Sequence, residues 1–202
     1  MAINGIYHFI ETEFKVMKNE KDIICVAPVN GGDYPETTVK LTLNEGMDLY
    51  ELFEVNDGNE YKVDVFTDKY KSIIALYFLS KSKLEERKYN TDGHIAVENV
   101  ASLNDLQKML KTFLDGNYYS LLKMMPDKII LEKSTNDKYN VLFLGKRDSK
   151  TYITKSRNLN SAAIVLYNFS FKLSQFYALI NKTEVKNDDD FIETLKELYL
   201  LG

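Results

Sequence analysis

The 202-residue sequence contains one cysteine, three prolines, nine glycines and two histidines. A single cysteine excludes an intramolecular disulfide, and the apolar run around Cys25, DIICVAP, predicts a small buried hydrophobic side chain there. Scarce proline and glycine argue against long structureless linkers. The N-terminus lacks the basic region and pure apolar core of a secretory signal. We therefore expect a protein of the reducing cytosol.

Signatures of common catalytic sites are also missing. His8, His94 and Cys25 are too few and too far apart in sequence to predict a histidine–cysteine zinc site. Neither a nucleophile elbow, a P-loop nor a dinucleotide-binding glycine pattern occurs. These absences favour a non-enzymatic protein without cofactor or metal. A carboxylate-metal hydrolase stays open as an alternative, because carboxylate ligands for a metal need no local spacing.

Only one hydrophobic run is long enough to cross a bilayer, at residues 162–180. Lys172 lies near its middle, where a charge costs several kcal/mol in a membrane. We therefore expect a buried core element and no membrane partner. Part of the run also alternates as a strand does, but its length and its start at Asn158 favour a helix.

The pattern of apolar residues predicts a strand-rich first half. Strands are predicted in a hairpin over 14–28 that turns at 19–21, and at 37–43, 60–68 and 72–78. The run at 72–78 is continuously apolar, as in a strand that is buried on both faces. Residues 47–55 fit alternation badly and are predicted as a short helix.

The charged stretch 81–93 has little to bury and marks a hinge or boundary. After it the sequence predicts a helix over 102–125 with a cap at Ser102 and a break at Gly116-Asn117. Three strands follow (128–134, 139–145 and 150–156), and then C-terminal helices, of which the last is capped by Asp190.

The predicted fold class is therefore α+β. An antiparallel, strand-rich N-terminal lobe is followed by a helix, a three-stranded β segment and C-terminal helices. We expect a strand-rich acidic lobe at 1–88 and a mixed α/β lobe at 89–202, which could also form one continuous domain.

Negative charge is concentrated in the first lobe. Residues 33–68 contain ten acids and two lysines, a net charge of −8, whereas the whole chain has a net charge of −4. A surface of one sign steers and orients a partner of the opposite sign. We therefore predict a protein-binding module of the inhibitor, immunity or counter-defence type, with a basic protein partner. The predicted contact residues are acidic: Asp48, Glu51, Glu54, Asp57, Glu60 and Asp64.

Positive charge collects at residues 145–158, against the single acid Asp148. The basic residues there are Lys146, Arg147, Lys150, Lys155 and Arg157. They suggest, as an alternative function, binding of a nucleotide or nucleic acid. Strand alternation sends Lys150 and Lys155 to opposite faces, and lysines at a hairpin also protect a sheet edge. No RNA- or DNA-binding motif accompanies them, so protein binding is preferred.

Overall fold

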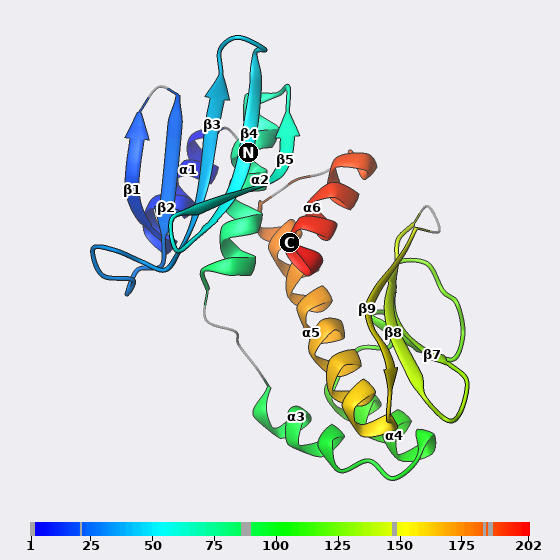
Figure 1. Cartoon of the computed structure of the whole chain (residues 1–202). Coiled ribbons are helices and arrows are strands. Elements are labelled where there is room, and N and C mark those ends of the chain that lie inside the picture. The colour runs from blue at the N-terminus through cyan, green and yellow to red at the C-terminus, as the bar shows by residue number, and fades with distance from the viewer. Residues whose placement is uncertain (1–2, 21, 86–89, 147–148, 184, 186–187) are drawn as a thin grey trace. The chain divides into compact units, whose positions relative to one another are not determined.

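The computed structural model of the chain is an α+β fold with six helices and two sheets in its described part (Figure 1). It describes residues 3–20, 22–85, 90–146, 149–183, 185 and 188–202. The chain divides into two compact units. Unit 1 comprises residues 1–86 and 180–202, and unit 2 comprises residues 87–179.

Unit 1 contains a five-stranded antiparallel sheet with the strand order β1-β2-β3-β4-β5. Its strands are β1 (Lys15–Glu20), β2 (Ile23–Ala27), β3 (Thr37–Asn44), β4 (Leu49–Asn56) and β5 (Asn59–Phe66). The hairpin within 14–28 and the strands at 37–43 and 60–68 are confirmed. The strands at 37–43 and 60–68 alternate apolar and polar residues, and short turns join β1 to β2, β3 to β4 and β4 to β5, so these consecutive strands pair as neighbours.

Within the described residues, unit 1 also contains α1 (Ile3–Glu13), α2 (Lys69–Lys83), α6 (Asp189–Leu201) and the C-terminal end of α5 (Leu159–Thr183). Figure 1 shows α1 and α2 against one face of the sheet. The side chains that the sheet turns towards these helices form its buried layer, with Val39, Leu41 and Leu52 at 0 to 3% exposure. Helix α6 packs against α2.

The strand predicted at 72–78 is wrong, because these residues form the middle of helix α2. Every residue from Ser72 to Ser80 is buried, since α2 is enclosed by the sheet, α1 and α6. A helix that is apolar all round has no amphipathic period, so its local pattern equals that of a buried strand. The carboxylate of Asp68 caps this helix by accepting a hydrogen bond from the Lys71 backbone N–H at 2.8 Å.

The helix predicted at 47–55 is also wrong, because these residues form strand β4. β4 lies between β3 and β5 and pairs with both along its length. These two ladders satisfy its backbone groups and override the weak local preference for a helical turn. The final helix is capped by Asp188 and not by Asp190; the Asp188 carboxylate accepts from the Phe191 backbone N–H at 3.0 Å.

Unit 2 contains a four-stranded sheet with the order β6-β7-β8-β9. Its strands are β6 (Tyr119–Leu121), β7 (Lys128–Lys133), β8 (Tyr139–Leu144) and β9 (Lys150–Arg157). The three predicted strands are confirmed as the antiparallel β7-β8-β9. β6 adds a short parallel edge within a stretch that was predicted to continue a helix.

The helices of unit 2 are α3 (Thr91–Glu98), α4 (Leu103–Phe113) and the first part of α5 (Leu159–Thr183). Ser102 caps α4 as predicted, with its hydroxyl accepting from the Asp105 backbone N–H. The prediction that 162–180 is helical is confirmed by α5. Leu166, Leu173 and Phe176 bury its apolar side. Among the described helices, none combines the length and apolar character needed to cross a membrane.

Candidate functional site: the open face of the five-stranded sheet

The two faces of the unit 1 sheet differ in what covers them. Paired residues on neighbouring antiparallel strands point to the same face. Val39, Leu41 and Leu52 point towards α1 and α2, so their immediate neighbours in sequence point away. We name this second side the open face, because no helix of unit 1 within the described residues packs on it.

A row of three lysines crosses the open face. The register of the four strand pairs places one residue of each strand side by side: Lys18, Cys25, Lys40, Phe53 and Lys62. A neighbouring row contains Glu20, Ile23, Thr42, Glu51 and Val65. Positive and negative rows therefore alternate on this face.

Each lysine of the row forms an ion pair with a glutamate of the same face. Lys62 lies 2.6 Å from Glu51, and Lys18 lies 3.2 Å from Glu20. The Lys40 ammonium pairs with Glu60. Lys40 also lies over the Phe53 ring, 4.9 Å from its centroid. The charges of the open face thus balance one another in the absence of a partner.

Between the charges, the open face exposes apolar side chains. Ile23, Cys25 and Phe53 are half-buried, and Val65 near the sheet edge is exposed. The sequence predicted a buried Cys25, whereas its side chain lies in the centre of this face as a half-buried free thiol. Apolar area in the middle of a charged rim resembles the composition of a protein interface.

The structure separates Glu51 from Glu54, which the predicted short helix over 47–55 would have placed on one face. Glu51 and Glu60 lie on the open face. Glu54 lies on the helix-covered face, where Lys83 of α2 approaches to 2.7 Å and the Asn56 amide donates at 2.8 Å. Burial alone would raise the pKa of the Glu54 carboxyl, but these two hydrogen bonds hold it below its ordinary value.

The remaining predicted acids occupy turns and a bulge. Asp48 and Asp57 adopt left-handed backbone conformations, with φ of 52° and 50°, in the β3–β4 and β4–β5 turns. These turns lie at opposite ends of the sheet. Asp64 lies beside the bulge in β5, and its carboxylate accepts from the Val65 backbone N–H. The six predicted acids therefore do not form one continuous patch.

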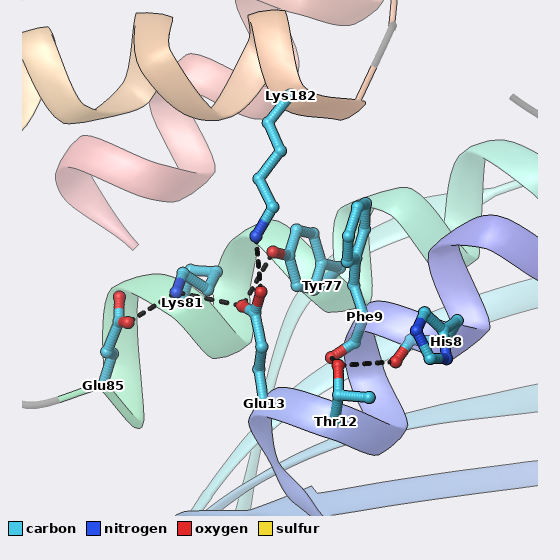
Figure 2. Close-up of polar contacts among 8 residues, drawn as sticks. All are labelled: His8, Phe9, Thr12, Glu13, Tyr77, Lys81, Glu85 and Lys182. Carbon is cyan, nitrogen blue, oxygen red and sulfur yellow. Dashed lines mark hydrogen bonds and ion pairs between the residues drawn. The ribbon is translucent and has the colours of Figure 1, made fainter.

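Figure 2 shows a polar cluster in unit 1 that the sequence did not predict. Glu13 at the end of α1 accepts hydrogen bonds from the Lys81 ammonium at 3.1 Å, the Tyr77 phenol at 2.8 Å and the Lys182 ammonium at 2.6 Å. Burial alone would raise the pKa of Glu13, but the hydrogen bonds from these donors lower it. Burial raises the pKa of the Tyr77 phenol, and its hydrogen bond to the Glu13 carboxylate raises it further. Three donors from two helices converge on this one carboxylate, so we assign it a structural role.

The basic stretch 145–158 is part of the β8–β9 hairpin in unit 2. Lys146 is exposed in the turn, and Arg147 lies outside the described residues. The Lys150 ammonium lies 3.8 Å from a Glu132 carboxylate oxygen. The Arg157 guanidinium donates to the Thr154 hydroxyl at 3.0 Å.

A bulge in β9 corrects the predicted orientation of Lys155. Val141 pairs with Thr154 and Leu142 with Tyr152, so Ile153 is an extra residue. Thr154 therefore moves to the other face, and Lys155 returns to the face of Lys150 and Tyr152. In agreement, the Lys155 ammonium lies 4.3 Å from the centroid of the Tyr152 ring.

Among the described residues, no three histidine, cysteine, aspartate or glutamate side chains gather in a way that could hold a metal ion. No protein-family model, curated protein or solved structure matches the chain. The geometry of its own residues is therefore the basis for the function proposed below.

Proposed function

We propose that the chain is a non-enzymatic protein-binding module of the inhibitor type, whose open face contacts a partner with a basic surface. One observation carries this proposal. Half-buried apolar side chains around Phe53 lie between glutamates on a sheet face that no described helix of unit 1 covers. Burial of this apolar centre would supply affinity, and the glutamates would set orientation.

The internal ion pairs of the open face do not prevent such binding. Lys62 is 51% exposed, so its pair with Glu51 contributes on the order of 0.2–1 kcal/mol. An arginine of a partner can replace the lysine and form two parallel hydrogen bonds to the carboxylate. At Glu60 the carboxylate is 48% exposed and is open to a further cation of a partner, whereas its lysine, Lys40, is only 18% exposed. Asp48 and Asp57 extend the negative rim at the two ends of the sheet.

The test compares two triple variants that each remove three negative charges. D48N/E51Q/E60Q changes the open face and its rim with little change in side-chain volume. D92N/D137N/E197Q changes three exposed acids elsewhere and is the matched control. Full-length tagged protein captures its partner from the cells that make it, and the purified partner is then measured against each variant by biolayer interferometry.

We expect the open-face variant to bind at least about tenfold more weakly than the parent, because three lost charge pairs of on the order of 0.5 kcal/mol each sum to that factor. The control should bind as the parent does, and added salt should weaken parental binding. The partner should lose activity when the parent protein is bound. Equal affinity of the two triple variants for the same partner would contradict the proposal.

A second candidate function rests on the bulge in β9. It places Lys150 and Lys155 on the same face as Tyr152, whose ring is 39% exposed. Lysines beside an exposed aromatic ring can hold single-stranded nucleic acid by ion pairing and base stacking. Fluorescence anisotropy of labelled oligonucleotides at low salt tests this, with K150Q/K155Q against the control K108Q/K138Q. Absence of binding at low salt would remove this candidate.

A further inference from the structure

A cavity of about 270 Å³ lies within unit 1 at the end of the sheet that carries the β1–β2 turn. Its floor is apolar and includes the buried side chains of Ile24, Leu41 and Ile73. Six polar residues also line it: Asn19 and Glu20 of β1, Tyr7 of α1, Asp22 of the β1–β2 turn, Tyr50 of β4 and Lys69 of α2. The Glu20 carboxylate is already paired with Lys18 at 3.2 Å. An apolar body with a few convergent polar groups is the usual composition of a small-molecule site.

The cavity contains one unpaired charge of each sign. The Asp22 Oδ1 atom is buried and, within the described part of the chain, accepts no hydrogen bond. Lys69 is exposed at the start of α2, and among the same described residues its ammonium has no ion-pair or hydrogen-bond partner. The two groups line one cavity but do not pair with each other. A shielded carboxylate oxygen without a donor is costly, and most buried polar groups in proteins are satisfied.

The two tyrosines add neutral hydrogen-bonding groups. Burial raises the pKa of the Tyr7 phenol, and the nearby Tyr50 phenol and Glu11 carboxylate raise it further. The Tyr7 hydroxyl therefore stays protonated at neutral pH and can donate a hydrogen bond to an anionic oxygen. Lys69 and the phenol together offer donors to a carboxylate, whereas Asp22 offers an acceptor to an ammonium group.

We propose that this cavity binds a small aliphatic α-amino acid. The ligand ammonium would lie at Asp22, its carboxylate at Lys69 and the tyrosine phenols, and its side chain on Ile24, Leu41 and Ile73. A simple amine would leave Lys69 without a partner, and a simple carboxylate would leave Asp22 without one. Rotation of the Asp22 carboxylate about χ2, a broad torsion, lets either oxygen face the cavity.

The cavity shares Glu20 and Ile23 with the open face, whereas its lining side chains Ile24 and Leu41 point to the helix-covered side of the sheet. None of the acids changed in the protein-binding test, Asp48, Glu51 and Glu60, lines the cavity. The two proposals can therefore fail independently, and each has its own probe.

The first experiment titrates L-leucine into the ¹⁵N-labelled full-length protein and follows the amide resonances by NMR. Binding should shift amides that line the cavity, in β2 and at the start of α2, and leave those of unit 2 unchanged. Two matched analogues isolate the charges: 3-methylbutylamine is leucine without its carboxylate, and 4-methylpentanoate is leucine without its ammonium group. We expect each analogue to bind at least about tenfold more weakly, the loss typical of one charge-assisted hydrogen bond.

The second experiment assigns each charge to its residue. D22N should weaken leucine binding at least tenfold and make leucine no better a ligand than 4-methylpentanoate. K69Q should also weaken leucine binding at least tenfold, and it should make leucine no better a ligand than 3-methylbutylamine. Matched controls, D57N in the distant turn and K108Q on α4, should bind leucine as the parent does.

Three results would overturn the proposal: no shift of cavity amides at millimolar leucine, analogues that bind as tightly as leucine, or unchanged affinity in D22N and K69Q. The analogue comparison uses only the parent protein, so it decides the question even if a variant does not fold.

Discussion

Charge reversal at two positions of one strand measures which way each side chain points. Glu51 and Glu54 both lie on β4, three residues apart, and their side chains are 19% and 17% exposed. The exposed fraction of the glutamates therefore does not distinguish the two positions. The exposed fraction of their lysine partners does: Lys62 beside Glu51 is 51% exposed on the open face, whereas Lys83 beside Glu54 is 23% exposed on α2.

The structure predicts unequal costs for Glu51→Lys and Glu54→Lys. Breaking a fully buried pair costs about 3–5 kcal/mol, and the partial exposure of Glu54 and Lys83 reduces this to about 2–3 kcal/mol. The reversal also removes the acceptor of the Asn56 amide. At Glu51 the lost pair has an exposed partner, so we expect a cost of about 0.2–1 kcal/mol.

Urea denaturation followed by circular dichroism gives the free energy of unfolding of both variants. The double variant E54K/K83E restores the pair with its charges exchanged and should recover most of the loss. Similar costs at the two positions would refute the placement of Glu54 against α2. Similar costs would instead fit two side chains on one exposed face, as in the short helix that was predicted for 47–55.

Two further predictions concern the polar cluster around Glu13 and the packing of α3. Glu13→Gln should lower the free energy of unfolding by about 1.5–3 kcal/mol at pH 7, because charged donors lose a charged acceptor. The pKa of Glu13 is lowered in the folded state, so its stabilisation is complete above the unfolded pKa of about 4.3 and is lost as pH falls through the folded pKa. The difference between Glu13→Gln and the parent in urea denaturation should therefore shrink towards pH 3, whereas the exposed control Glu11→Gln should show little difference at either pH. Gly93→Ala should cost about 1–3 kcal/mol, because the added Cβ would lie 2.0 Å from the Tyr167 hydroxyl oxygen and 2.5 Å from its ring. In the control Gly116→Ala, the added Cβ has no atom within 4 Å beyond those of its chain neighbours. An equal decrease in melting temperature in both alanine variants would disprove the packing of Gly93 against Tyr167.

The strands that the sequence predicted correctly are those whose pattern is local. β3 alternates Val39, Leu41 and Leu43 against polar residues, and this period of two exists only in a half-buried strand. Helix α4 was predicted from its Ser102 cap and its apolar stripe, both of which lie within a dozen residues. Such signals need no knowledge of the rest of the chain.

The wrong predictions arose where distant contacts decide the structure. The run Ser72–Ser80 is buried on every side, so it has no polar face to reveal its period. Its capping residue, Asp68, was the available signal for a helix. The Glu13 cluster left no local trace at all, because its donor Lys182 is 169 positions away in sequence.

The candidate site shows why a charge count along the sequence differs from charge on a surface. Of the ten acids in 33–68, at least four pair with lysines of the described part of the chain: Glu51 and Glu60 with residues of the same segment, and Glu54 and Asp33 with Lys83 and Lys15 from outside it. Asp48 and Asp57 carry positive φ angles that aspartate tolerates better than most residues, so turn geometry already accounts for them. What distinguishes the open face is therefore not excess negative charge but carboxylates that pair with lysines around an apolar centre. A partner that binds there must offer cations at the spacing of Glu51 and Glu60 and an apolar surface for Phe53, which is a stricter requirement than a basic surface alone.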